Sequence, residues 1–432
     1  MTDSQVPVLW ITGPAGVGKS TVSWQLFTEL ASAGTPVAFA DADQLCMCYP
    51  APPADPGRER IKAQNVGALV PRYRAAGAQC VIVNGCVDPR AGLRSELMPP
   101  AVVTVCRLRA DPGEITKRLT VRDGTGQSGP GGPIEAALSE AAALDASTFA
   151  DSCVDTSGVA AAAVAGLVRQ RCGDWPGFSQ SPQRARQAAG SSASGGSDPQ
   201  DQGALAANGA LAANIAVAGT DGVVAGADGA AGGADGAVAL ADGAAAGADG
   251  EVLLICGPTG VGKSTIGFQV YVQRVRQGHK AGYVDLDQIG FIRPGQAGDP
   301  GNHWLKATNL AAMGRTYHAE GARHLVATGP VESDAALRAY IEALPAARVT
   351  VCRLHAGPAE LSRRIMSRAD GGSWPQPGDP LRGQPAGYLR EVADRAIRDA
   401  DAQEQNGPES IRVDTDGRSA GEAADLIAAL AG

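Results

Sequence analysis

Aromatic residues are scarce in this sequence, and signals for membrane insertion and secretion are missing from it. Phe, Trp and Tyr make up 4% of the 432 residues, whereas hydrophobic residues as a whole make up 44%. Hydrophobic cores are therefore expected to consist mainly of Ala, Val and Leu. No apolar run is long enough to span a membrane. We also expect no signal peptide, because an acidic residue and a polar loop stand where its apolar segment would lie.

Basic charge and paired cysteines are lacking as well. The formal net charge is −8, so no excess of Lys and Arg indicates a nucleic acid or an anionic membrane as a partner. The nine cysteines are scattered and form no C-x2-C pairs, which argues against a zinc site and against a disulfide framework. These absences together predict a soluble, cytoplasmic protein whose thiols stay reduced.

Two stretches have the G-x4-G-K-[ST] spacing of the phosphate-binding P-loop. Residues 13–21 read GPAGVGKST and residues 257–265 read GPTGVGKST; each stretch follows an apolar run and precedes a helical pattern. Backbone N–H groups of such a loop surround a polyphosphate, and the following helix directs its positive end toward it. We therefore expect each loop to bind ATP with Mg²⁺. The predicted nucleotide-binding residues are Gly13, Gly16, Gly18, Lys19, Ser20 and Thr21, and Gly257, Gly260, Gly262, Lys263, Ser264 and Thr265.

The two loops belong to a longer internal repeat. The offset of 244 residues between them also relates Asp43 to Asp287 and Lys62 to Lys306. Each copy is about 175 residues long, which is the size of a complete domain. The sequence thus predicts two related domains rather than a series of small structural repeats.

Short apolar runs alternate with helical patterns in both copies. This alternation predicts an α/β fold of the P-loop nucleoside triphosphatase type, with three α/β/α layers and a five-stranded parallel sheet, in residues 1–175 and again in residues 251–432. Ligands of such sheets bind at the carboxyl ends of the strands, where both P-loops fall. The predicted strands are 7–12, 36–40, 79–84, 101–106 and 152–155, and 251–256, 281–285, 323–328, 347–352 and 410–413.

Residues 176–250 separate the two copies and have a different composition. They are rich in Ala, Gly and Asp, and the dipeptide Asp-Gly recurs every seven residues from Asp221 to Asp249. Glycine in every seven-residue repeat and the lack of large apolar residues at heptad positions a and d argue against a coiled coil. We interpret this segment as a disordered linker, which leaves the two domains able to pair within the chain or to stay apart.

Three features narrow the class of P-loop protein. Neither third strand ends in the acidic pair that motor and AAA-type ATPases use around Mg²⁺, since the copies read VIVNG at 81–85 and LVATG at 325–329. No N-K-x-D segment is present to recognise guanine, and the second strand of each copy ends in Asp-x-Asp-Gln. This combination resembles the P-loop small-molecule kinases, such as shikimate, gluconate and adenylylsulfate kinases and the chloramphenicol phosphotransferases. The Ala-, Gly- and Arg-rich composition is similar to that of proteins from high-GC bacteria such as actinobacteria.

The resemblance implies roles for residues at the ends of the second strands. The first acid of each pair would hold Mg²⁺ through water, together with the hydroxyl group that follows the P-loop lysine. Asp43 and Asp287 would face the acceptor and orient or deprotonate its hydroxyl group. Alternatively, these acids only cap the segment that follows them. The predicted metal-binding residues are Ser20, Asp41, Ser264 and Asp285.

Two helices would complete the site. Arg364 and Arg368 lie four residues apart on one helix face, in a region that forms a phosphate-gripping lid in similar kinases; plain surface charges would have the same spacing. The helix after the second strand contacts the acceptor in the related kinases, although a solvated helix face is equally compatible with its pattern. The predicted catalytic residues are Lys263, Asp287, Arg364 and Arg368, and the predicted substrate-binding residues are Asp43, Lys62, Asn65, Asp287, Lys306 and Asn309.

The sequence therefore predicts a phosphotransferase that uses Mg-ATP and acts on a hydroxyl group of a small molecule, with a nucleotide and a small acceptor as its ligands. The alternative is a non-catalytic or slowly hydrolysing nucleotide-binding regulator, which the duplication and the missing acidic pair favour. The second copy is expected to carry most of the chemistry. In the first copy residues 123–152 contain no Arg or Lys, and Asn84 stands where the second copy has Thr328.

Overall fold

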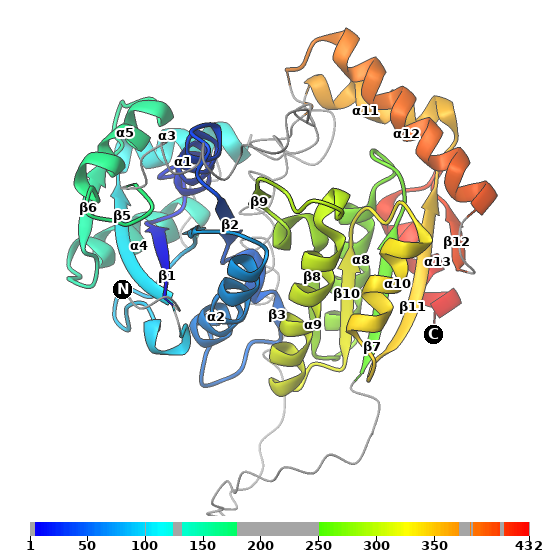
Figure 1. The fold of residues 1–432 in the computed structure, drawn as a ribbon, viewed down its shortest axis with the longest axis horizontal. Helices are drawn as coiled ribbons and strands as arrows, with labels where there is room; N and C mark the ends of the chain where they lie inside the picture. The colour runs from blue at the N-terminus through cyan, green and yellow to red at the C-terminus, as the bar shows by residue number, and fades with distance from the viewer. Residues whose placement is uncertain are drawn as a thin grey trace, which may run out of the picture.

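The computed structural model describes residues 5–99, 101–123, 132–178, 250–370, 381, 383–406 and 410–431. These residues form two α/β domains, each built on a six-stranded sheet (Figure 1). The first domain precedes the predicted linker and the second follows it. Most of that linker, residues 179–249, lies outside the described residues.

The elements of the two domains follow one another in the same order, apart from the additional helix α10 in the second. In the first domain they are β1 (Val6–Thr12), α1 (Lys19–Ser32), β2 (Val37–Asp41), β3 (Cys48–Tyr49), α2 (Glu59–Ala75), β4 (Cys80–Asn84), β5 (Ala101–Arg109), α3 (Pro112–Asp123), α4 (Pro133–Asp145), β6 (Ser152–Asp155) and α5 (Ala161–Arg171). In the second they are β7 (Glu251–Cys256), α8 (Lys263–Arg276), β8 (Ala281–Asp285), β9 (Ile292–Arg293), α9 (His303–Ala319), β10 (His324–Thr328), α10 (Asp334–Ala343), β11 (Arg348–His355), α11 (Pro358–Ser367), α12 (Ala386–Asn406), β12 (Ile411–Asp414) and α13 (Ala420–Ala431).

Each sheet contains the five predicted parallel strands and one additional strand. The order is β6-β5-β1-β4-β2-β9 in the first sheet and β12-β11-β7-β10-β8-β3 in the second. The strands β9 and β3 run antiparallel to their neighbours β2 and β8. The prediction of a purely parallel, five-stranded sheet is therefore wrong at one edge. The additional strand has only two residues and belongs to the other domain, so no periodicity in the sequence indicates it.

Helices cover both faces of each sheet because successive strand residues point to opposite sides. In β1, Val8 and Trp10 pack into the core on the side of α2, whereas Leu9 and Ile11 pack into the core on the side of α1 and α5. All four side chains are fully buried. Burial of side chains of this size stabilises a fold by about 1.5–3 kcal/mol each. An apolar strand without alternation is thus the expected pattern for a central strand with two buried faces.

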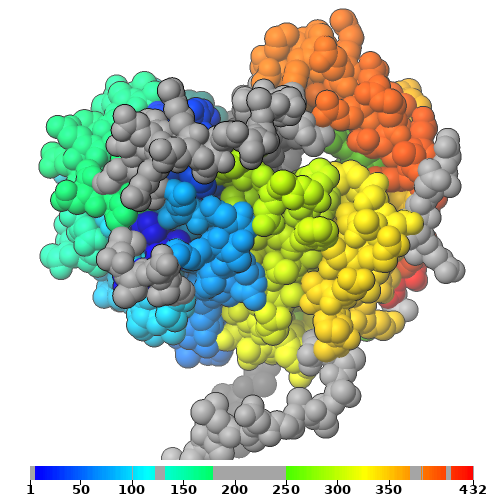
Figure 2. Space-filling view, in the orientation of Figure 1, coloured from blue at the N-terminus to red at the C-terminus, as the bar shows by residue number. Residues whose placement is uncertain are grey.

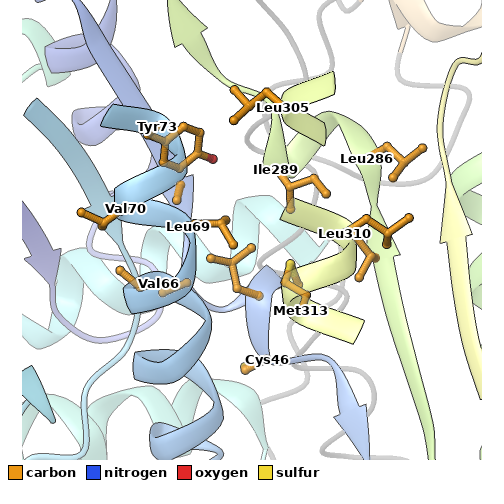
Figure 3. Close-up of a cluster of buried hydrophobic side chains, with 14 of the residues drawn as sticks. Cys46, Val66, Leu69, Val70, Tyr73, Leu286, Ile289, Leu305, Leu310 and Met313 are labelled. Carbon is orange, nitrogen blue, oxygen red and sulfur yellow. The ribbon is translucent and has the colours of Figure 1, made fainter. Parts of the chain in front are cut away.

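The two domains share one hydrophobic core (Figure 3). Helices α2 and α9 lie side by side across the boundary (Figure 1), and the surfaces of the domains meet without a visible gap (Figure 2). The Tyr317 hydroxyl group donates a hydrogen bond of 2.9 Å to the carbonyl oxygen of Leu45 in the other domain. Arg60 forms a salt bridge of 2.7 Å with Glu320. The apolar side chains labelled in this core are Cys46, Val66, Leu69, Val70, Tyr73, Leu286, Ile289, Leu305, Leu310 and Met313.

Candidate functional site

The two P-loops have nearly the same backbone conformation. Each loop follows the first strand of its domain and ends where α1 or α8 begins, at Lys19 or Lys263. Glycine is required in the loop, since a Cβ atom at Gly257 would lie 2.7 Å from the carbonyl oxygen of Leu354. The φ angles are 144°, 79° and 98° at Gly13, Gly16 and Gly18, and 146°, 83° and 102° at Gly257, Gly260 and Gly262. The predicted strand–loop–helix context is therefore present twice.

The P-loop lysines lie across their loops. The Nζ atom of Lys263 donates a hydrogen bond of 2.9 Å to the carbonyl oxygen of Pro258, and that of Lys19 donates one of 2.7 Å to the carbonyl oxygen of Gly13. Burial lowers the pKa of Lys263. A buried cation at a helix N-terminus is a favourable environment for phosphate groups, because their negative charge compensates the desolvation of the ammonium group.

A hydroxyl group and a carboxylate meet beside each P-loop. The Ser264 hydroxyl group donates a hydrogen bond of 2.8 Å to Oδ2 of Asp285. Burial and the nearby carboxylate of Asp287 raise the pKa of Asp285 to about 6. The equivalent residues of the first domain are Ser20 and Asp41. The amide of Asn84 donates a hydrogen bond to each of them, at 3.0 Å to Asp41 and 3.3 Å to Ser20.

These oxygen atoms fit a magnesium ion that arrives with its nucleotide. Mg²⁺ prefers oxygen ligands, retains several water molecules and is commonly bound by one or two protein groups together with phosphate oxygens. Ser264 and Asp285 offer such a pair, and Ser20 and Asp41 offer another. Among the residues that the structure describes, no group of three or more His, Cys, Asp or Glu side chains forms a metal site by itself. Phosphate and water would thus supply the remaining ligands.

The predicted acceptor residues Asp287 and Lys306 form an ion pair, with Oδ1 and Nζ 2.9 Å apart. The Asp287 side chain is 40% exposed, whereas that of Lys306 is 8% exposed. Burial opposes ionisation of Asp287, but the ammonium group of Lys306 outweighs it and lowers the pKa of the carboxyl group. The Asp287 carboxylate is therefore ionised at neutral pH and oriented by a fixed cation.

A second carboxylate, which the sequence analysis missed, lies beside this pair. Nε2 of His303 is 2.7 Å from Oε2 of Glu332, and Nδ1 of the same ring is 3.1 Å from the hydroxyl group of Tyr340. Burial opposes ionisation of Glu332, but the hydrogen bond from His303 lowers the pKa of this carboxyl group. The sequence held a signal for its partner His303, which precedes Lys306 by three residues and therefore shares its helix face.

The corresponding carboxylate of the first domain, Asp43, is more enclosed. The Asp43 side chain is 20% exposed and lies 3.1 Å from the ammonium group of Lys62. It also accepts hydrogen bonds from the backbone N–H group of Cys86. The second domain has Pro330 at the position of Cys86, and proline has no N–H group to donate. The Asp287 side chain is the more exposed of the two carboxylates, at 40%.

The P-loop and the predicted acceptor residues of the second domain line one cavity of about 650 Å³. Its wall on the P-loop side includes Gly257 and Lys263, and its acceptor side includes Asp287, Lys306 and Glu332. Further wall residues come from α12 and from the segment that follows α11, among them Arg368, Leu381, Tyr388, Glu391, Arg395 and Asp399. The volume lies in the range typical of small-molecule sites.

Three predicted site residues support the site from behind instead of lining it. The Arg364 guanidinium group donates hydrogen bonds to the carbonyl oxygens of Val261 and Thr415, and it therefore ties the P-loop to the loop after β12. Asn65 and Asn309 are fully buried. Their amide groups donate to the carbonyl oxygens of Leu45 and Ile289, at 2.5 and 2.7 Å. In each domain this asparagine thus holds the loop after the second strand.

Comparisons with known proteins yield matches only among solved structures. No family model and no curated protein matches the chain. The tunicamycin resistance protein of Deinococcus radiodurans is 21% identical, with 42% of this chain and 96% of that chain covered and a TM-score of 0.28. A gluconokinase from Sinorhizobium meliloti is 15% identical, with coverage of 43% and 94% and a TM-score of 0.28. The APS kinase of Mycobacterium tuberculosis is 16% identical, with coverage of 42% and 97% and a TM-score of 0.26.

Each of these solved chains matches less than half of this chain, and none of them identifies a substrate for it. Within the ranges that the structure describes, no helix has the length and apolar character needed to cross a membrane.

Proposed function

We propose that the second domain transfers the γ-phosphoryl group of Mg-ATP to a hydroxyl group of a small molecule. The observation that carries this proposal is the shared cavity, in which the P-loop lysine Lys263 and the ionised carboxylate of Asp287 face the same space. Phosphoryl transfer depends mainly on positioning the two reactants and on neutralising the charge of the moving group. Lys263 and Arg368 supply positive charge on the nucleotide side, and Asp287 supplies an acceptor-binding group opposite them.

In the proposed reaction the acceptor oxygen forms a bond to the γ-phosphorus while the bond to the β–γ bridging oxygen breaks, and ADP leaves. The hydroxyl proton passes to Asp287 or from there to water. The lowered pKa of Asp287 makes it a weak base. That property suits a loose transition state, which needs little deprotonation of the attacking hydroxyl group. Asp287 therefore acts chiefly by accepting a hydrogen bond that orients this group. Mg²⁺, when bound with the nucleotide, neutralises charge on the phosphate oxygens.

The acceptor side of the cavity favours a molecule rich in hydrogen-bond donors. Asp287 and Glu332 are both carboxylates of lowered pKa, and Lys306 is already paired with the first of them. Ionised carboxylates accept hydrogen bonds but do not donate them. A polyhydroxylated or amino-bearing acceptor complements such a pair better than an acidic one does.

The first domain is proposed to bind nucleotide without performing most of the chemistry. Its acceptor carboxylate, Asp43, is engaged by Lys62 and by the backbone of Cys86. A ligand hydroxyl group would have to compete with these contacts. The intact P-loop at Lys19 requires no such rearrangement, so nucleotide binding is retained in this proposal.

The test is the release of ADP from ATP with and without a library of hydroxyl-bearing metabolites. We expect metabolite-dependent release by the unmodified protein. Asp287→Asn should lower it by roughly two to three orders of magnitude, because a preorganised group at the reacting centre is lost. The matched control is Asp43→Asn, which changes the same group in the first domain and should retain most activity.

Two outcomes would contradict these assignments. Release of ADP that is independent of every metabolite would favour the nucleotide-binding regulator over the kinase. Equal impairment by Asp43→Asn and Asp287→Asn would show that the chemistry is not confined to the second domain.

A further inference from the structure

Each domain contains a socket of three aromatic side chains, although aromatic residues are rare in the chain as a whole. In the first domain Trp24 and Phe27 come from α1, and Phe39 comes from β2; their ring centroids are 4.9–5.9 Å apart. The equivalent residues of the second domain are Phe268, Tyr271 and Tyr283, with ring centroids 5.7–5.8 Å apart. The helix that begins at the P-loop thus contributes two rings to each socket.

The side chain that fills the socket of the first domain belongs to the second domain. The ring of Phe291 lies 5.4 Å from that of Trp24 and 6.0 Å from that of Phe39, in edge-to-face geometry. Phe291 is 7% exposed, and its carbonyl oxygen accepts a hydrogen bond of 3.0 Å from the N–H group of Phe39. The strand β9 follows immediately and pairs with β2, so backbone and side chain hold the same segment.

The reciprocal contact uses Met47, which stands 244 residues before Phe291. Met47 is 2% exposed and packs in the core that contains Phe268, Tyr271 and Tyr283. Its carbonyl oxygen accepts a hydrogen bond of 2.9 Å from the N–H group of Tyr283. Each domain therefore inserts one side chain from the loop after its second strand into the socket of the other.

In the second domain, this inserted segment also forms part of the wall of the cavity. Residues Gly290, Phe291, Arg293, Gly295 and Gln296 all line it. The second domain holds the beginning of the segment itself, since the amide of Asn309 donates to the carbonyl oxygen of Ile289 and that of Asn302 donates to the carbonyl oxygen of Gly290. From Phe291 to Arg293 the backbone pairs with the first domain.

We propose that the first domain is a structural part of the acceptor site in the second. Seating of Phe291 in the socket of Trp24, Phe27 and Phe39 fixes the wall segment 290–296, so the cavity of the second domain is complete only with the first domain folded beside it. Displacement of a positioning group by about 1 Å can cost two orders of magnitude in rate. Phe291 and Trp24 are thus positioning residues, and the description of the segment as an acceptor wall rests on the proposed function.

The test is hydrogen–deuterium exchange on the full chain, which needs neither acceptor nor turnover. Phe291→Ala should accelerate exchange in a peptide covering residues 288–297 by about tenfold or more, because a buried ring that anchors the segment is removed. Trp24→Ala, a change in the other domain, should accelerate exchange in the same peptide. The conservative change Phe291→Leu should retain most of the protection that Phe291→Ala loses.

Met47→Ala is the matched control, since it empties the other socket. It should accelerate exchange in residues 44–51 and leave residues 288–297 unchanged. Equal acceleration of both peptides by either variant would overturn the proposal, because it would indicate general loosening of the interface. Unchanged exchange in residues 288–297 after Phe291→Ala would overturn it as well.

Once the metabolite library provides an acceptor, steady-state kinetics gives a second test. Phe291→Ala should then raise KM for the acceptor about tenfold or more, with KM for ATP unchanged. If the exchange experiment succeeds and no acceptor is found, the proposed function fails while the positioning of the wall segment stands. An equal rise in both KM values would count against a role specific to the acceptor.

Discussion

The carboxylate of Asp43 lies 3.1–3.2 Å from the backbone nitrogen of Cys86, which donates to both of its oxygen atoms. The repeat places Pro330 at the position of Cys86 in the second domain, where Asp287 takes the position of Asp43. Because proline has no N–H group, position 330 cannot donate to Asp287 as Cys86 donates to Asp43, although the sequences around the two carboxylates are nearly identical. A backbone difference thus distinguishes the two sites.

This difference can be tested with Pro330→Ala. The variant restores an N–H group opposite Asp287 and should engage the carboxylate as Cys86 engages Asp43. Hydrogen bonds to charged groups contribute about 1.5–3 kcal/mol, so we expect metabolite-dependent turnover to fall by roughly tenfold or more. Steady-state kinetics measures the change, and nucleotide affinity serves as the control. Unaltered turnover would contradict the importance of the missing donor.

Both P-loops are expected to bind Mg-ATP. Their glycine φ angles agree closely, and each lysine donates a hydrogen bond to the carbonyl oxygen of the proline in its loop, Pro14 or Pro258. Titration calorimetry with a non-hydrolysable ATP analogue should give two sites per chain. Lys19→Met and Lys263→Met should each remove one site, because the ammonium charge that compensates the phosphates is lost. A single site in the unmodified protein would refute this prediction.

The affinity for Mg-nucleotide should fall as the pH decreases. The pKa of Asp285 is raised to about 6 by burial and by Asp287, and that of Asp41 to about 7 by burial and by Asp43. In the predicted magnesium sites the ion would bind the ionised carboxylates, so protons would compete with it below these values. In the Lys19→Met variant only the second site remains, and its affinity should weaken as the pH falls through about 6.

A fluorescent ATP analogue titrated from about pH 8 to pH 5 measures this effect. Asp285→Asn is the control, since it removes the titrating group and should flatten the profile. Persistence of the same pH dependence in Asp285→Asn would show that another group is responsible.

Cleavage between the domains should not separate them. The sequence predicts that residues 179–249 are accessible to proteases, and a cleavage site placed there would cut the only covalent connection. The strands β3 and β9, each of which pairs with the sheet of the other domain, and the shared core should keep the halves together in gel filtration without denaturant. Leu69 is fully buried in this core, so Leu69→Asp should allow the cleaved halves to separate. Separation of the unmodified halves would contradict the shared core.

The sequence by itself determined the repeated α/β pattern, the two P-loops and the acids at the ends of the second strands. Lys263, Asp285 and Asp287 are brought together because a parallel sheet gathers the carboxyl ends of its strands at one edge. The same local rules gave all five parallel strands of each domain. Apolar runs, glycine spacing and helix periodicity are short-range signals, and they are readable without knowledge of the partner segments.

Tertiary structure alone decided the remaining features. The strands β3 and β9 have two residues each, and they form only because an unpaired edge of the other domain's sheet lies beside them. Asn65 and Asn309 are fully buried, and each donates a hydrogen bond to a carbonyl oxygen of the loop after the second strand. Glu332 becomes part of the site through His303, which lies 29 residues away in the chain. These outcomes depend on contacts between distant segments, whose energies are set by packing and desolvation and not by local sequence.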